Sequence, residues 1–192
     1  MASLGTIALG NYDAGNSSDT STNGSDPLLE VIASADDADY AYDNANNTHT
    51  GIAAFALDNM PGDFGTMNSV SINLRYGKDT HTGTNTWDSL AAQIVQSDGS
   101  TALTDNTTIV SGPITTTTAT NSGATTLTNP DTTSGASIWN GAIVLIRFGI
   151  TKSKGGDSDQ ERVYAAEVTG DYDVSSGTMI PLFMHCYNQM TT

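Results

Sequence analysis

The stretch Tyr164-Ala165-Ala166-Glu167-Val168-Thr169-Gly170-Asp171-Tyr172-Asp173-Val174 decides the fold class of this chain. Its even-numbered positions are aromatic, aliphatic or glycine, and its odd-numbered positions are polar apart from one alanine. A period of two places the two sets on opposite faces of an extended strand. The stretch therefore predicts an antiparallel β-strand with one buried face and one solvated face.

Similar patterns earlier in the chain predict the other strands. Residues 69–76 alternate in the same way, with Val70, Ile72 and Leu74 separated by polar residues. Further strands are predicted from short apolar runs at 28–33, 52–57, 90–96, 142–150 and 179–187. The Asp98-Gly99 pair that follows the run at 90–96 is typical of a hairpin turn.

The composition also indicates an all-β class. Thr, Ser, Asn, Asp and Gly dominate the polar residues, and the good helix formers Glu and Lys are scarce. We therefore predict a single antiparallel β-sandwich with long polar loops, and within that class a jelly roll. The nearest alternative is an immunoglobulin-type sandwich, whose Cys…Trp…Cys pattern is absent from the sequence.

The 192 residues fit one domain with an N-terminal extension. Residues 1–27 are mostly polar and are predicted to form an extended arm, whereas residues 28–192 form the sandwich. Leu4, Ile7 and Leu9 make one short apolar piece within the arm. The arm is either a flexible terminus or a segment that becomes ordered on a neighbouring subunit.

The C-terminal run at 179–187 is apolar on both faces of the predicted strand. Such a strand must be covered on both sides, by this chain or by another subunit. The residues predicted as assembly contacts are the apolar ones of the arm and of this run: Leu4, Ile7, Leu9, Ile180, Leu182, Phe183 and Met184.

The charge balance excludes some classes of partner. The chain has 21 acidic residues against 6 Lys and Arg, for a formal net charge of −15. We therefore predict no nucleic-acid partner and no anionic membrane surface as partner. No apolar run approaches the roughly 18–20 residues of a membrane span, and Met1–Gly5 lacks the start of a signal peptide. Synthesis in a cytoplasm is the expectation.

Residues with catalytic or ligand-binding potential are few. The single Cys186 predicts no disulfide and no thiolate zinc site. His49, His81 and His185 have no metal-ligand spacing. We predict no catalytic residues, no cofactor and no enzymatic activity.

Other acidic and aromatic residues leave alternatives open. Glu167 and Asp171 could form a glycosidase pair, but a solvated strand face is the stronger interpretation. Trp87 is the better candidate for an exposed sugar platform, whereas Trp139 is expected at the edge of the core. One cluster of acidic residues either binds calcium or forms a solvated acidic loop; its members are Asp36, Asp37, Asp39 and Asp43.

The order of features resembles a family of virion proteins. An acidic loop with Asp39-Tyr40 precedes the strand at 69–76, and the 98–101 hairpin precedes a Thr/Gly-rich stretch. Trp139-Asn140-Gly141 then leads into an apolar strand, and the alternating strand follows. Over about residues 30–175 this order resembles the jelly-roll capsid decoration, or cement, proteins of tailed bacteriophages.

The resemblance implies a non-enzymatic protein that binds the outer surface of a phage head and stabilises it. Its partner would be the major capsid protein, its oligomeric state a homotrimer, and its location the capsid surface of the virion. A strongly acidic, disulfide-free sandwich suits a protein made at high copy number. The alternatives are a tail or head fibre or adhesin domain, a carbohydrate-binding module, and a jelly-roll hydrolase or lyase.

Overall fold

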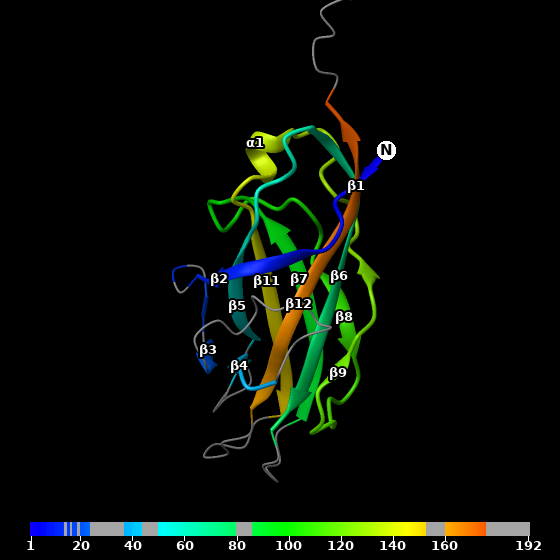
Figure 1. Cartoon of the computed structure of the whole chain (residues 1–192). Helices are drawn as coiled ribbons and strands as arrows, with labels where there is room; N and C mark the ends of the chain where they lie inside the picture. The colour runs from blue at the N-terminus through cyan, green and yellow to red at the C-terminus, as the bar shows by residue number, and fades with distance from the viewer. Residues whose placement is uncertain are drawn as a thin grey trace, which may run out of the picture.

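Antiparallel β-strand is almost the whole regular structure of the computed structural model, as predicted (Figure 1). The structure describes residues 1–13, 15, 17–18, 20–23, 37–43, 50–79, 86–152 and 160–175. Within these residues the one helix is α1 (Ala136–Trp139), a single turn.

The first sheet, sheet A, is built on two long strands that pair along most of their length. They are β6 (Phe64–Lys78) and β12 (Glu161–Val174), with Val168 opposite Ile72. Short strands extend sheet A on both sides: β9 (Thr120–Asn121) and β10 (Thr125–Thr126) beside β6, β1 (Ala2–Ser3) and β4 (Tyr40–Asp43) beside β12, and β3 (Thr20–Asn23) beside β4.

The second sheet, sheet B, lies behind sheet A in Figure 1. Its strands follow the order β5 (Thr50–Leu57), β11 (Ile143–Lys152), β7 (Thr86–Val95) and β8 (Thr107–Ser111). The nearly uniform apolar run of β11 predicts a central strand, and β11 does lie between β5 and β7. The hairpin predicted at Asp98-Gly99 turns the chain after β7, with Val95 bridged to Ala102.

The main hydrophobic core lies between the two sheets. Phe55, Leu90 and Phe148 of sheet B are fully buried there, as are Ile72 and Leu74 of sheet A. A second, smaller cluster lies on the other side of sheet B and consists of Ala54, Val95, Ile143 and Leu145. These residues alternate along their strands with the core residues, which places them on the outer face.

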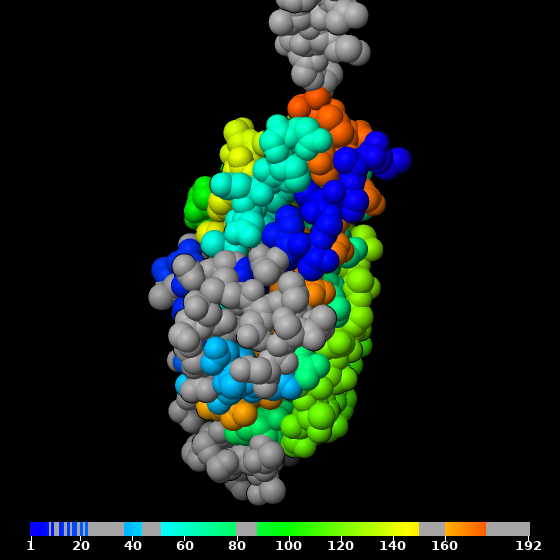
Figure 2. All heavy atoms as spheres, viewed as in Figure 1, coloured from blue at the N-terminus to red at the C-terminus, as the bar shows by residue number. Residues whose placement is uncertain are grey.

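The predicted N-terminal arm is wrong for the first twelve residues. The strand β2 (Ile7–Tyr12) crosses from one sheet to the other, with Ile7 opposite Val168 of β12 and Leu9 opposite Leu57 of β5. Leu9 is fully buried. The N-terminal residues, in dark blue, lie flat against the body in Figure 2. Because their strand partners come from distant parts of the sequence, local polarity alone suggested an arm.

The strand β12 breaks its period of two at one point. A register shift separates Val163 from Ala165, so Tyr164 is an extra residue there. Val163 and Ala166 both reach the main core. Tyr164 instead contacts the ring of Tyr40, at 5.7 Å between ring centroids. The pattern had predicted Tyr164 on the same face as Ala166, and the bulge corrects this.

Two predicted strands, at 28–33 and 179–187, lie outside the described residues. The jelly-roll connectivity stays a prediction within the observed class of antiparallel sandwich.

Candidate functional site

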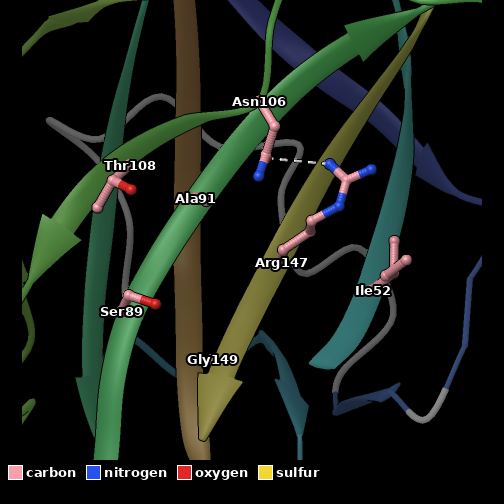
Figure 3. A pocket seen from close by; sticks show the side chains of 7 residues that line it. All are labelled: Ile52, Ser89, Ala91, Asn106, Thr108, Arg147 and Gly149. Carbon is pink, nitrogen blue, oxygen red and sulfur yellow. Dashed lines mark hydrogen bonds between the residues drawn. The ribbon is translucent and has the colours of Figure 1, made fainter. Parts of the chain in front are cut away.

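The outer face of sheet B carries an open pocket of about 420 Å³ (Figure 3). Four strands or their flanking turns supply its lining: Ile52, Ser89, Ala91, Asn106, Thr108, Arg147 and Gly149. The lining combines amide and hydroxyl groups with small and aliphatic side chains. Among these described residues one is charged, Arg147, through its guanidinium.

Strand register brings these residues together. Arg147 of β11 lies opposite Ile52 of β5 on one side and opposite Ala91 of β7 on the other. Gly149 lies opposite Ser89 in the same pairing. Residues directly opposite in an antiparallel pair share a face. Since Phe148 enters the core, its neighbours Arg147 and Gly149 face outward.

The guanidinium of Arg147 is held by two neutral side chains. Its Nη2 donates to Oε1 of Gln93 at 2.9 Å, and its Nη1 donates to Oδ1 of Asn106 at 3.2 Å. Burial lowers the pKa of Arg147 from its ordinary value. The group nevertheless stays charged, because arginine is not deprotonated in proteins. The pocket therefore contains a fixed cation with neutral hydrogen-bond partners.

Short side chains bound one side of the pocket, because β11 and β7 approach each other closely there. A Cβ atom at Gly149 would collide with Oγ of Ser89 on the neighbouring strand. Any larger residue at position 149 would have to displace Ser89. The short side chains of Ser89 and Ala91, and the absence of one at Gly149, leave the space beside the Arg147 guanidinium open.

A second polar site lies inside the sandwich, at the end of β12. Glu161 lies directly opposite Asp43 of β4, and both side chains are fully buried. Neither oxygen of the Glu161 carboxyl has a hydrogen-bond partner among the described residues. Burial raises the pKa of Glu161 well above its ordinary value, and the nearby charges of Asp43 and Asp88 raise it further.

The sequence pattern did not indicate that Glu161 faces inward. The alternation over 164–174 assigns odd-numbered positions to the solvated face, and the bulge at Tyr164 is what turns Val163 and Glu161 to the inner face. Asp43 lies two residues after the core residue Ala41, so the period of two places it on the inner face of β4.

The structure separates the acidic residues considered for calcium. Oδ2 of Asp37 accepts a hydrogen bond from Nη2 of Arg75 at 2.6 Å, whereas Asp43 turns into the interior. Asp36 lies outside the described residues. Where side chains are described, no three His, Cys, Asp or Glu residues gather as a metal site.

Tyrosines gather on the outer face of sheet A. The ring of Tyr40 contacts those of Tyr42 and Tyr164 edge-on, and the guanidinium carbon of Arg162 lies 4.2 Å from the Tyr40 ring centroid. These rings use their faces and edges on one another and on Arg162. The arrangement is a packed cluster of tyrosines on this face.

The N-terminal residues predicted as assembly contacts lie within the sandwich. Leu9 is fully buried and Ile7 is 9% exposed. Leu4 is half-buried against the core, and its backbone N–H donates to the carbonyl of Gly170 at 2.8 Å. Ile7 and Leu9 therefore belong to the core of the domain itself, which corrects their assignment as contacts, whereas the role of the half-buried Leu4 stays a prediction.

The C-terminal residues predicted as assembly contacts lie outside the described residues. They are Ile180, Leu182, Phe183 and Met184, and Cys186 lies outside with them. Their role as contacts stays a prediction.

The residues considered for catalysis or sugar binding are not brought together by the described structure. Asp171 is exposed on the outer face of β12 and accepts a hydrogen bond from Oγ of Ser69 at 3.3 Å, while Glu167 is half-buried on the same strand. Trp139 is fully buried, as predicted for a core-edge anchor. The side chain of Trp87 lies outside the described part of the chain. The same holds for all three histidines, which are His49, His81 and His185.

Comparison with known protein families finds no family model that matches the chain, and no curated protein matches it in sequence. The one-turn α1 is far too short to cross a membrane, and the described residues contain no other helix.

Proposed function

We propose that this chain is a non-enzymatic virion protein, a decoration or cement protein that binds the outer surface of a tailed-phage head and stabilises it. The partner in this proposal is the major capsid protein, the assembly is a homotrimer, and the fold is a jelly roll. The location is the capsid surface.

One observation carries the proposal: the Arg147 pocket opens on the broad face of sheet B rather than among the loops at an end of the sandwich. A docking surface on a sheet face can lie flat against a large partner, and contact surfaces commonly have an apolar centre with a few fixed polar groups. The outer cluster of Ala54, Val95, Ile143 and Leu145 on the same sheet face is itself buried, and the partly buried Ile52 that packs against it is the aliphatic residue that reaches the pocket.

A second observation concerns one end of the sandwich. Among the described residues, the exposed large apolar side chains are Met1 and Val174. The amino group of Met1 lies 3.9 Å from Oδ1 of Asp173, so both exposed side chains belong to the same end of the molecule. The chain continues from this end toward the apolar run at 179–187. This end is therefore a candidate contact region.

The test is binding to heads that lack the protein. Heads assembled from the capsid protein encoded in the same genome are mixed with purified chain, and co-sedimentation is measured over a range of protein concentrations. We expect saturable binding and a higher melting temperature of the decorated heads. The absence of binding at micromolar concentrations would contradict the proposal.

The tyrosine cluster favours one second candidate, a fibre, adhesin or carbohydrate-binding module. Tyr40 and Tyr42 are half-buried on the outer face of sheet A and retain partly exposed rings. This candidate predicts glycan binding that Tyr42→Ala weakens. A glycan array with the wild type and this variant separates the two functions.

A further inference from the structure

We infer that the Arg147 pocket is a carboxylate-binding subsite, whose occupant is an Asp or Glu side chain of the partner protein. That the partner is a capsid protein rests on the proposed function. The chemistry of the subsite follows from the residues around the guanidinium.

Arg147 has more hydrogen-bond donors than its two partners use. A guanidinium carries five N–H donors in a fixed fork. The two bonds to Gln93 and Asn106 use one N–H on each terminal nitrogen. The remaining three N–H groups have no acceptor among the described residues. Two parallel N–H donors match the two oxygens of a carboxylate.

Arg147 has no acidic partner among the described residues. The chain has 21 acidic residues for 6 basic ones, yet none of the described side chains that line the pocket is acidic. Arg75 bonds to Asp37, and Arg162 lies 3.9 Å from Asp79. Arg147 differs from both, because its two partners are neutral. None of the described residues of this chain therefore supplies a carboxylate to Arg147.

The shape of the pocket is set by the small residues beside Arg147. Ala91 and Gly149 leave room beside the guanidinium, and Ile52 supplies an aliphatic wall (Figure 3). The Asn106 amide and the Ser89 and Thr108 hydroxyls add groups that can donate to an anion. A short aliphatic stem ending in a carboxylate fits this lining. Among the side chains that the structure describes, no aromatic ring lines the pocket.

The net charge of −15 does not prevent this pairing. Charges separated by more than about 8 Å are largely screened at physiological salt. The guanidinium and the bound carboxylate would be in direct contact and partly desolvated, so their attraction is screened much less.

The experiment uses the full chain and two matched variants. Arg147→Met keeps a long unbranched side chain and removes the charge, and Lys78→Met removes one positive charge from sheet A. The first readout is a titration of ¹⁵N-labelled protein with N-acetyl-glutamate amide, with N-acetyl-glutamine amide as the neutral match. We expect the Arg147 Nε–H signal to shift only with the glutamate probe, and no binding of that probe by Arg147→Met.

The second readout is binding to heads. Arg147→Met should weaken binding about tenfold or more, as for a desolvated charge pair, while Lys78→Met binds as the wild type does. Circular dichroism spectra and melting curves of both variants identify any loss of folding. Arg147→Lys, which retains the charge without the fork, should lie between Arg147→Met and the wild type.

The outcomes separate this inference from the proposed function. If the glutamate probe binds at Arg147 but the wild type does not bind heads, the subsite stands and the proposed partner falls. If heads bind Arg147→Met and the wild type equally, the subsite is overturned and the head-binding function stands. Binding of an oligo-uronate but not of the glutamate probe would overturn the assignment to a protein carboxylate.

Discussion

At the scale of single residues, Glu161 links the stability of the sandwich to pH. Its carboxyl is fully buried beside Asp43, and burial raises its pKa well above the ordinary value of 4.5. Between those two pKa values the native state holds a proton that the unfolded chain has lost. The contribution of Glu161 is therefore complete below pH 4.5 and is lost as pH rises through the folded pKa.

We predict that Glu161→Gln reduces this pH dependence. Each pH unit in that interval lowers the free energy of unfolding by up to about 1.4 kcal/mol. At pH 8 the free energy of unfolding of the variant should therefore be higher than that of the wild type by about 1 kcal/mol or more. Urea unfolding at pH 5 and pH 8 measures this. Asp171→Asn, on the solvent face of the same strand, is the control. An unchanged difference between the two pH values in Glu161→Gln would contradict the prediction.

Asp131 shows the opposite behaviour. Hydrogen bonds from Ser134 and Thr133 lower its pKa from 3.8 to about 2. Its contribution to stability is thus present above pH 3.8 and is lost as pH falls through about 2. We predict a side-chain carboxyl titration near 2 by NMR, and a return toward 3.8 in Ser134→Ala, which lacks the hydroxyl donor. A titration near 3.8 in both proteins would mean that these bonds do not form in solution.

At the scale of elements, β2 closes the sandwich by pairing with both sheets. We predict that Leu9→Ala lowers the free energy of unfolding by about 2–5 kcal/mol, because it empties a fully buried site. Leu4→Ala, at a half-buried site, should lower it by about 1 kcal/mol or less. Urea midpoints of both variants test this. Equal and negligible effects would mean that the first strands do not belong to the folded unit.

The elements differ in how much of them the sequence predicts. The strands β5, β6 and β11 follow from local patterns, because alternate side chains of each strand face the main core. The strand β2 does not, since it pairs with residues about fifty and about 160 positions away and has only one fully apolar pair, Leu9 and Leu57, across its join to sheet B.

The candidate site was predicted even less well. Each lining residue taken alone looks like an ordinary outer-face residue, and only strand register brings Ile52, Ala91 and Arg147 side by side. One signal was available: Arg147 is the single charged residue within the apolar run at 142–150. A charged residue in such a run indicates a position that faces outward, because charged side chains are almost never fully buried unless they are paired.

At the scale of the whole molecule, the proposed function depends on surfaces outside the core. With Ile7 and Leu9 assigned to the core, the predicted assembly contacts that remain are Leu4 and the run at 179–187. We predict that a chain ending at Ser175 keeps its melting temperature within about 4 °C of the full chain, a shift that corresponds to about 1–2 kcal/mol at most, and loses binding to heads. A truncated chain that binds heads normally would exclude this run as a contact.

The most direct test of the account is the copy number of this chain in purified virions, measured by quantitative peptide mass spectrometry against the major capsid protein. A decoration protein is predicted to be present at a copy number comparable to that of the capsid protein. A few copies per particle would contradict capsid decoration and assign the chain to a tail or a fibre. Complete absence from the particles would contradict a virion function altogether.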